Sequence, residues 1–198
     1  MKKFFLLLMA AATFNANAAL ISITTDKDTY DVGETIMATV SATELFDDNA
    51  VQTYFYGYKA LFNFDSSLLS LDVTSVLDLG ALGNQPMVDT NESSESTLNI
   101  ISIESFFAAF VPFFEGAVFT QNGKSTVELF SFNLLALNAG TVELSPVNSV
   151  ITNNGGVALP NVSTESTSFT IAQVPAPGTF ALSLLALGGM FFARKRAK

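Results

Sequence analysis

Residues 126–146, TVELFSFNLLALNAGTVELSP, decide the fold class of this chain. Their first half alternates large apolar residues with neighbours that are mostly polar, which is the period of a strand with one buried face. NAG at 138–140 then gives a turn, and TVELSP at 141–146 predicts a second strand. The two faces of the first strand are Phe130, Phe132 and Leu134 against Leu129, Ser131 and Asn133.

The same alternation recurs along the chain. TIMATVSA (35–42) places Ile36, Ala38, Val40 and Ala42 opposite Thr35, Met37, Thr39 and Ser41. YFYGYKALFNF (54–64) predicts a long strand, or two strands bent at Gly57, with an aromatic face that includes Tyr54, Tyr56, Tyr58, Phe62 and Phe64. Further strands are predicted at 68–77, 97–105 and 167–173. About eight or nine short strands, polar turns and no convincing amphipathic helix predict an all-β fold, a β-sandwich.

One segment, SFFAAFVPFFEGAVF (105–119), has two interpretations. The first is a core strand interrupted by a loop at Pro112. The second is an exposed aromatic patch that binds a partner or a sugar. Six Phe without Trp or Tyr favour burial, because sugar platforms usually need a polar edge on the ring.

The first 18 residues have the three parts of a secretory signal peptide. Lys2 and Lys3 form a basic region, Phe4–Ala12 is the apolar core, and Ala16 and Ala18 frame an A-x-A cleavage site. We therefore expect cleavage after Ala18 and export through the inner membrane.

Composition excludes several function classes. Segment 19–173 holds three lysines (Lys27, Lys59 and Lys124) and all eighteen acidic residues, so its net charge is −15 and nucleic-acid binding is not expected. The chain has no Cys and no His, which excludes Ser-His and Cys-His nucleophiles and His- or Cys-liganded metals. Carboxylate chemistry, Lys-assisted chemistry and oxygen-liganded calcium remain open.

No catalytic residue and no cofactor are predicted. Asp26, Asp28 and Asp31 are weak candidates for calcium, but they lack the D-x-D-x-D-G pattern of a calcium loop. Aspartates of this kind are more often solvated turn residues. Asp65, followed by Ser66 and Ser67, is likewise predicted to be a turn residue after a strand.

The body of the chain resembles cohesin-type domains. DVGETIMATVSA (31–42), YGYKALFNFDSSLLSL (56–71) and VELFSFNLLALNAGTVELSP (127–146) are similar to three stretches of that family. The resemblance implies a nine-stranded jelly-roll β-sandwich. In cellulosomes this fold binds dockerin modules through one face of the sandwich, but no residue of that face is identified here by a motif.

The C-terminus resembles a PEP-CTERM sorting signal. The matching parts are a proline motif, an apolar segment at 180–193 and a basic end, and they predict a short transmembrane helix with its basic end in the cytoplasm. Ala176 stands where that family usually has Glu. The motif and basic residues are Val174, Pro175, Ala176, Pro177, Arg194, Lys195 and Arg196.

The two resemblances together predict three parts: a signal peptide (1–18), a cohesin-like domain (19–173) and a sorting signal (174–198). They imply an exosortase-type processing enzyme as partner, a transient membrane anchor, and final location at the cell surface or outside it. The implied role is a non-catalytic matrix or biofilm protein, linked to exopolysaccharide, that binds a protein or polysaccharide. The alternatives are a periplasmic binding domain that keeps its membrane anchor, and an extracellular carboxylate-dependent hydrolase.

Overall fold

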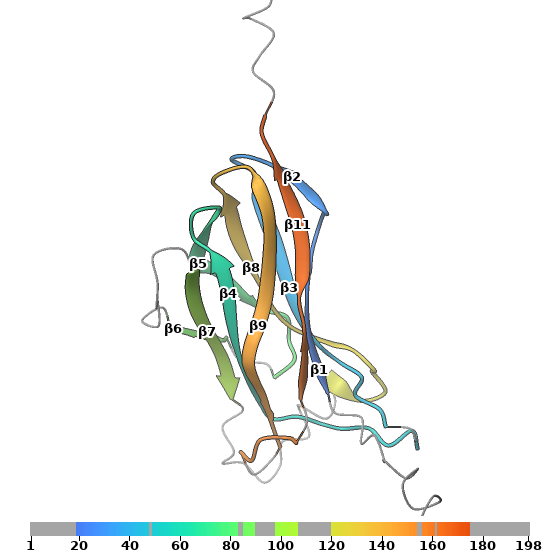
Figure 1. Ribbon diagram of the computed structural model, residues 1–198. Coiled ribbons are helices and arrows are strands. Elements are labelled where there is room, and N and C mark those ends of the chain that lie inside the picture. The colour runs from blue at the N-terminus through green and yellow to red at the C-terminus, as the bar shows by residue number, and fades with distance from the viewer. Residues whose placement is uncertain are drawn as a thin grey trace, which may run out of the picture.

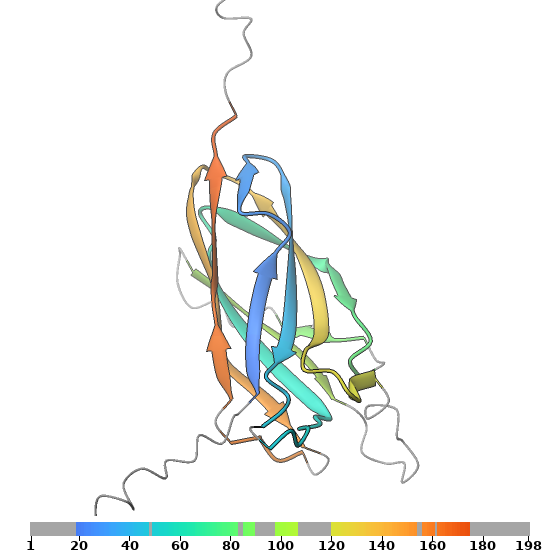
Figure 2. The same ribbon diagram turned by 90° about the vertical axis from the view of Figure 1, so that its right-hand side faces the viewer.

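The computed structural model describes residues 19–47, 49–82, 85–89, 98–106, 120–153, 156–160 and 162–174. Two β-sheets pack face to face into an elongated sandwich (Figure 1). Residues 19 and 174, the first and last that the structure describes, lie at opposite ends of the sandwich (Figure 2).

The described residues form eleven strands in two sheets. Sheet A has the order β10-β1-β3-β8-β5, and sheet B has the order β2-β11-β9-β4-β7-β6. The strands are β1 (Leu20–Thr25), β2 (Thr29–Asp31), β3 (Thr35–Thr43), β4 (Gly57–Asp65), β5 (Leu69–Asp78), β6 (Met87–Asp89), β7 (Leu98–Phe106), β8 (Val127–Ala136), β9 (Gly140–Thr152), β10 (Ser163–Glu165) and β11 (Thr167–Ala172).

The first two and the last two strands connect the sheets along one side of the sandwich. β1 and β10 pair in parallel in sheet A, and β2 and β11 pair in parallel in sheet B. Each terminal segment therefore contributes to both sheets, passing from one to the other after Thr25 and after Glu165. The remaining pairs are antiparallel.

Aromatic rings from the two sheets meet in the core. Tyr58 and Phe62 of β4 contact Phe130 of β8, at ring-centroid distances of 5.5 and 6.0 Å. Phe62 also lies 5.6 Å from Phe132. Burying a ring of this size contributes about 1.5 to 3 kcal/mol, and ring pairs add about 0.5 to 1.5 kcal/mol. The two aromatic stretches of the sequence therefore hold the sheets together.

The predicted β-sandwich is confirmed, with more strands than expected. β3, β5, β7, β8 and β11 lie within one or two residues of the predicted segments. The inward face of β3 is the predicted one, with Ile36, Ala38, Val40 and Ala42 buried. The described residues form eleven strands instead of the predicted eight or nine, because three-residue strands are too short to show alternation. These additional short strands are β2, β6 and β10.

Two details of the aromatic strand prediction are wrong. β4 begins at Gly57, so Tyr54 and Tyr56 lie before it and are half-buried, while Phe55 is fully buried. Phe55 faces the core in place of Tyr54 and Tyr56 because residues 53–56 form no strand. The backbone of Phe55 pairs with the side chain of Gln121 and not with a neighbouring strand.

Irregular pairing explains two further differences. Leu129 was placed opposite the apolar face, yet it is buried because β3 pairs Val40 with Phe130 and Ser41 with Glu128, which leaves Leu129 as an extra residue. β9 continues to Thr152 rather than ending near 146. Asn148 has a positive φ of 48° at a shift in the pairing with β4, so the alternation is interrupted within one strand.

Several predictions fall outside the described residues. These are the signal peptide, most of the Phe-rich segment (107–119) and the segment after Val174. Within the described residues, no helix is long and apolar enough to span a membrane.

Candidate functional site

The carboxylate of Asp26, a calcium candidate, is used inside the fold. Its Oδ1 accepts hydrogen bonds from the Tyr30 hydroxyl at 2.7 Å and from the Met37 amide at 3.0 Å. Burial raises the pKa of Asp26, but these two hydrogen bonds outweigh it and leave the pKa below its ordinary value. Asp26 therefore holds the connection between β1 and β2 against β3.

The other two candidates lie in the same connection without joining Asp26 in a cluster. The Asp28 carbonyl accepts from Thr170, and the Asp31 amide donates to the carboxylate of Glu34. Glu34 also forms an ion pair with Lys27. In the described part of the chain, no three acidic residues are grouped so as to hold a metal ion. The calcium prediction gains no support from this geometry.

The sorting residues are mostly beyond the described part. Val174 is its last residue and is 51% exposed. The strand before it, β11, ends beside β2, where the Val32 amide donates to the Ala172 carbonyl at 3.0 Å. Outside the described residues lie Ala16, Ala18, Pro175, Ala176, Pro177, Arg194, Lys195 and Arg196.

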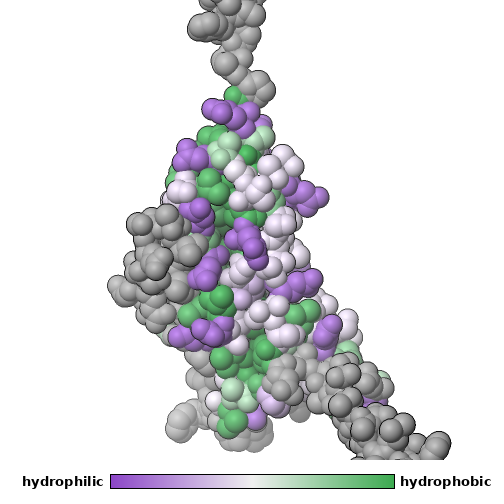
Figure 3. Space-filling model, in the orientation of Figure 1, coloured by the Kyte–Doolittle hydropathy of each residue, from purple (hydrophilic) through white to green (hydrophobic). Residues whose placement is uncertain are grey.

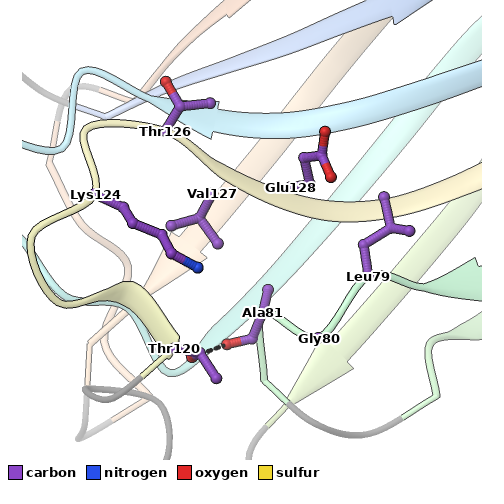
Figure 4. A pocket seen from close by; sticks show the side chains of 8 residues that line it. All are labelled: Leu79, Gly80, Ala81, Thr120, Lys124, Thr126, Val127 and Glu128. Carbon is purple, nitrogen blue, oxygen red and sulfur yellow. Dashed lines mark hydrogen bonds between the residues drawn. The ribbon is translucent and has the colours of Figure 1, made fainter.

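A pocket of about 320 Å³ lies where β5 ends and β8 begins, at the end of the sandwich away from Val174. Thr120 bridges its rim by donating to the Ala81 carbonyl at 2.9 Å. Figure 4 shows that Lys124 and Glu128 do not point toward each other across it. Glu128 is the one carboxylate among the lining residues, whereas glycoside hydrolysis needs two. The lining residues are Leu79, Gly80, Ala81, Thr120, Lys124, Thr126, Val127 and Glu128.

The outer face of sheet A carries a regular block of nine side chains from β3, β8 and β5. Residues paired directly across neighbouring strands share a face, so the pairing fixes three rows. We call this block the β8 surface. From β3 through β8 to β5, its rows are Thr35, Leu135 and Ser70; Met37, Asn133 and Asp72; and Thr39, Ser131 and Leu77.

A bulge in β5 places Leu77 on this surface. The pairing with β8 shifts between Asp72 and Leu77. Inside the bulge, Ser75 Oγ accepts from the Asn133 amide at 2.7 Å and donates to the Asp72 carbonyl at 2.6 Å. This hydroxyl fills the gap in the ladder and fixes the surface geometry.

Each row of the β8 surface contains one exposed apolar side chain. Met37, Leu77 and Leu135 are 47, 57 and 42% exposed, and they surround the half-buried Asn133. Asp72 is the one charged residue of the nine. Three strands about 4.8 Å apart and three rows about 6.8 Å apart cover roughly 300 Å². Exposed apolar side chains on rigid strands, with polar neighbours, are typical of an interaction surface.

The outer face of sheet B has a different character. Its centre has Leu61 of β4 paired with Val147 of β9, and both are half-buried. Lys59 and Asn63 flank Leu61 on β4. Figure 3 shows this face with hydrophilic and hydrophobic side chains interspersed. It is the second candidate surface, and Met87 of β6, which shares its face with Lys59 through Glu104, is 63% exposed there.

Sequence reasoning missed the β8 surface, although a signal was present. Met37 was assigned to the outward side of its strand, where an unbranched apolar residue stands among Thr and Ser. Leu135 continues the outward series of Ser131 and Asn133, whereas the face of Leu77 depends on the bulge in β5.

No protein family model matches the chain. No curated protein sequence matches it.

Solved structures of cohesin modules are similar to this chain. A type I cohesin of Pseudobacteroides cellulosolvens has a TM-score of 0.56 at 12% identity, covering 80% of this chain and 95% of that one. A type II cohesin–X-dockerin complex of Acetivibrio cellulolyticus gives 0.53 at 17%, covering 79% and 96%. A cohesin module of a Clostridium perfringens family 33 glycoside hydrolase gives 0.53 at 14%, covering 79% and 100%. At these identities the likeness establishes the fold: the described body is a cohesin-like β-sandwich.

Proposed function

We propose that this chain is an exported, non-catalytic binding module that binds a protein partner through the β8 surface. The observation that carries the proposal is the exposure of Met37, Leu77 and Leu135 at ordered, outward strand positions. Binding on one face also agrees with the fold, since a similar solved structure is a cohesin–dockerin complex.

The chemistry of the surface favours a protein over a polysaccharide. Among the described residues, the most exposed large apolar side chains are aliphatic, whereas eight aromatic rings are buried. Sugars stack on exposed rings, so an aliphatic and amide surface fits apolar protein side chains better. The buried rings are Tyr30, Phe55, Tyr58, Phe62, Phe64, Phe130, Phe132 and Phe169.

The size and charge of the surface restrict the partner further. A standard interface buries about 800 Å² on each side, so the roughly 300 Å² of the β8 surface forms a centre that a partner extends beyond. Asp72 and the net charge of −15 over 19–173 favour a partner with basic groups around an apolar centre.

The proposal includes the sorting pathway. Residues 1–18 direct export, and residues 174–198 hold the chain at the membrane for an exosortase-type enzyme that releases it to the surface or matrix. A link to biofilm or exopolysaccharide follows from the resemblance of the tail. In support, the described chain leaves the sandwich at Val174, far from residue 19 and with an exposed side chain.

A matched pair of variants tests the binding surface. Leu135→Lys and Leu61→Lys place the same charge on the outer faces of sheets A and B. Full chains tagged after Ala18 are used to capture partners from solubilised cells of the producing organism. We expect a partner with wild type and Leu61→Lys, and its loss with Leu135→Lys. The reverse pattern would move binding to sheet B, and capture of no protein by any form would contradict the proposal.

Cell fractionation with mass spectrometry of the mature C-terminus tests sorting. We expect the released protein to lack the apolar segment 180–193, and Ala176→Glu to increase release. An intact tail confined to the membrane fraction would instead identify a permanently anchored periplasmic domain.

A further inference from the structure

Asn122 and Gly123 form an exposed turn at the end of the sandwich away from Val174. The Lys124 amide donates to the Gln121 carbonyl at 3.0 Å and closes the turn, and Gly123 has a φ of 74°. Asn followed by Gly is the sequence in which the asparagine side chain is most easily attacked by the next backbone nitrogen, because glycine has no side chain to obstruct the approach.

Gln52 holds the nitrogen that would attack. The Gly123 amide donates to Gln52 Oε1 at 2.9 Å. Gln52 Nε2 in turn donates to the Gln121 carbonyl at 2.6 Å and to the Lys124 carbonyl at 3.0 Å. One side chain, 69 to 72 residues away in sequence, therefore fixes the backbone on both sides of Asn122.

The side chain of Asn122, which the Gly123 nitrogen would attack, is also held by a hydrogen bond. Asn122 Oδ1 accepts from the Tyr54 hydroxyl at 3.0 Å. The side chain of Gln121 also holds this loop. Its Oε1 accepts from the Phe55 backbone amide at 3.0 Å, and its Nε2 donates to the Phe55 carbonyl at 2.8 Å. Residues 52–55 and 121–124 therefore form one hydrogen-bonded unit.

We propose that Asn122 is a deamidation site whose reaction Gln52 holds back in the folded chain. In the reaction, the Gly123 nitrogen gives its proton to the solvent and bonds to Cγ of Asn122. The Cγ–Nδ2 bond breaks, and the nitrogen leaves as ammonia with a proton returned from solvent. Water then opens the cyclic imide at either carbonyl to give aspartate or isoaspartate, without oxidation or reduction.

These two hydrogen bonds determine how much the folded structure slows the deamidation of Asn122. Attack requires the Gly123 amide to leave Gln52 and the Asn122 side chain to leave Tyr54. Each neutral hydrogen bond of this kind lowers the population of the opened state about fivefold, so the folded chain reacts about 25-fold more slowly than a free peptide.

Reaction at this site would change the loop permanently. Isoaspartate adds a methylene to the backbone between residues 122 and 123, which moves the Gly123 amide away from Gln52. It also replaces a neutral amide by a carboxylate in a body of charge −15. If the chain is exported as in the proposed function, isoaspartate at residue 122 would accumulate with time after synthesis.

The test follows deamidation of the full purified chain in warm, mildly alkaline buffer by peptide mass spectrometry. Gln52→Met keeps the length of the side chain and removes its hydrogen bonds, and we expect Asn122 to deamidate at least about fivefold faster. Tyr54→Phe removes one hydrogen bond at this turn, whereas Gln52→Met removes three, so the increase with Tyr54→Phe is expected not to exceed about fivefold. Asn154–Gly155, the second Asn-Gly pair of the chain, is an internal reference whose rate should not change.

Gln85→Met controls for a general loss of stability, because the side chain of Gln85 also donates to a backbone carbonyl, that of Val76. It should leave the Asn122 rate unchanged. Equal rates in wild type, Gln52→Met and a synthetic TQNGKS peptide would overturn the proposal. A larger increase with Tyr54→Phe than with Gln52→Met would also overturn it, since Gln52 would not be the controlling residue.

Discussion

Gln121→Met tests how the loop before β4 is held. Gln121 is fully buried, and its side-chain amide pairs with both backbone polar groups of the buried Phe55. Methionine fills a similar volume but offers no such pairing. Leaving each of the two buried groups without a partner costs about 1 to 3 kcal/mol, so we expect the free energy of unfolding to fall by about 2 to 6 kcal/mol. This is a large share of the 5 to 15 kcal/mol typical of a domain.

Urea unfolding followed by circular dichroism measures the effect, since the chain has no Trp for fluorescence. We expect the midpoint to fall while the slope is unchanged, which identifies a change in stability rather than in compactness. Gln85→Met, which removes one hydrogen bond at an exposed residue, is the matched control. If both variants shift the midpoint equally, the Gln121 amide does not replace strand pairing at Phe55.

Gln121→Glu adds a dependence on pH. A protonated carboxyl can still donate to the Phe55 carbonyl, whereas the carboxylate cannot. Burial raises the pKa of this Glu in the folded chain above its unfolded value of about 4.3. Its stabilisation is then present below that value and is lost as pH rises through the folded pKa. Stability relative to wild type that does not change between acidic and neutral pH would contradict the buried pairing.

Three further predictions concern the body of the sandwich. Phe130→Ala should lower the free energy of unfolding by about 3 to 5 kcal/mol in urea titrations, because Phe130 contacts rings of both β4 and β8. Gly123→Ala should cost about 1 to 2 kcal/mol in the same assay, since its φ of 74° is unfavourable for alanine although the Cβ position is open. The pKa of Asp26 is lowered in the folded chain. The stability that Asp26 contributes is therefore present above its unfolded pKa and is lost as pH falls through its folded pKa. Thermal melts across acidic pH should show a shallower acid-induced loss of stability in Asp26→Asn than in wild type.

The sequence predicted the elements that depend on local alternation. β3 shows this most clearly, because its inward residues Ile36, Ala38 and Val40 alternate without interruption. The assignment of Asp65 to a turn is also confirmed: its Oδ1 accepts from the amide and the hydroxyl of Ser67. Asx turns of this kind involve residues two apart in the chain, so the local sequence identifies them.

The sequence did not predict which strands share a sheet. β8 and β9 are joined by the short turn at 138–140, but β8 belongs to sheet A and β9 to sheet B. Alternation shows that each strand has one apolar face. It does not show whether the next strand pairs beside it or packs against it, because both arrangements bury the same residues.

Candidate surface residues were the hardest to predict, because their exposure depends on distant partners. Leu77 reaches the β8 surface through the bulge that Ser75 fills beside Asn133, 58 residues later in sequence. A period of two counted along β5 without that bulge assigns the outward face differently. The surroundings of Asp26 also depend on strand pairing: Tyr30 and Met37, the latter eleven residues away, donate hydrogen bonds to its carboxylate.

In the proposed function, sorting and binding use different parts of the chain: the segment from residue 174 onward and the β8 surface. β9 has 13 residues, so at about 3.4 Å per residue the body is about 40 Å long between the end near Val174 and the Asn122 turn. The β8 surface lies on the outer face of sheet A, and its row of Thr35, Leu135 and Ser70 is near the end of the sandwich where the described chain ends at Val174. Changes at Ala176 should therefore alter location without altering partner capture, and Leu135→Lys should do the reverse. The double variant should show both effects, a changed location and a lost partner.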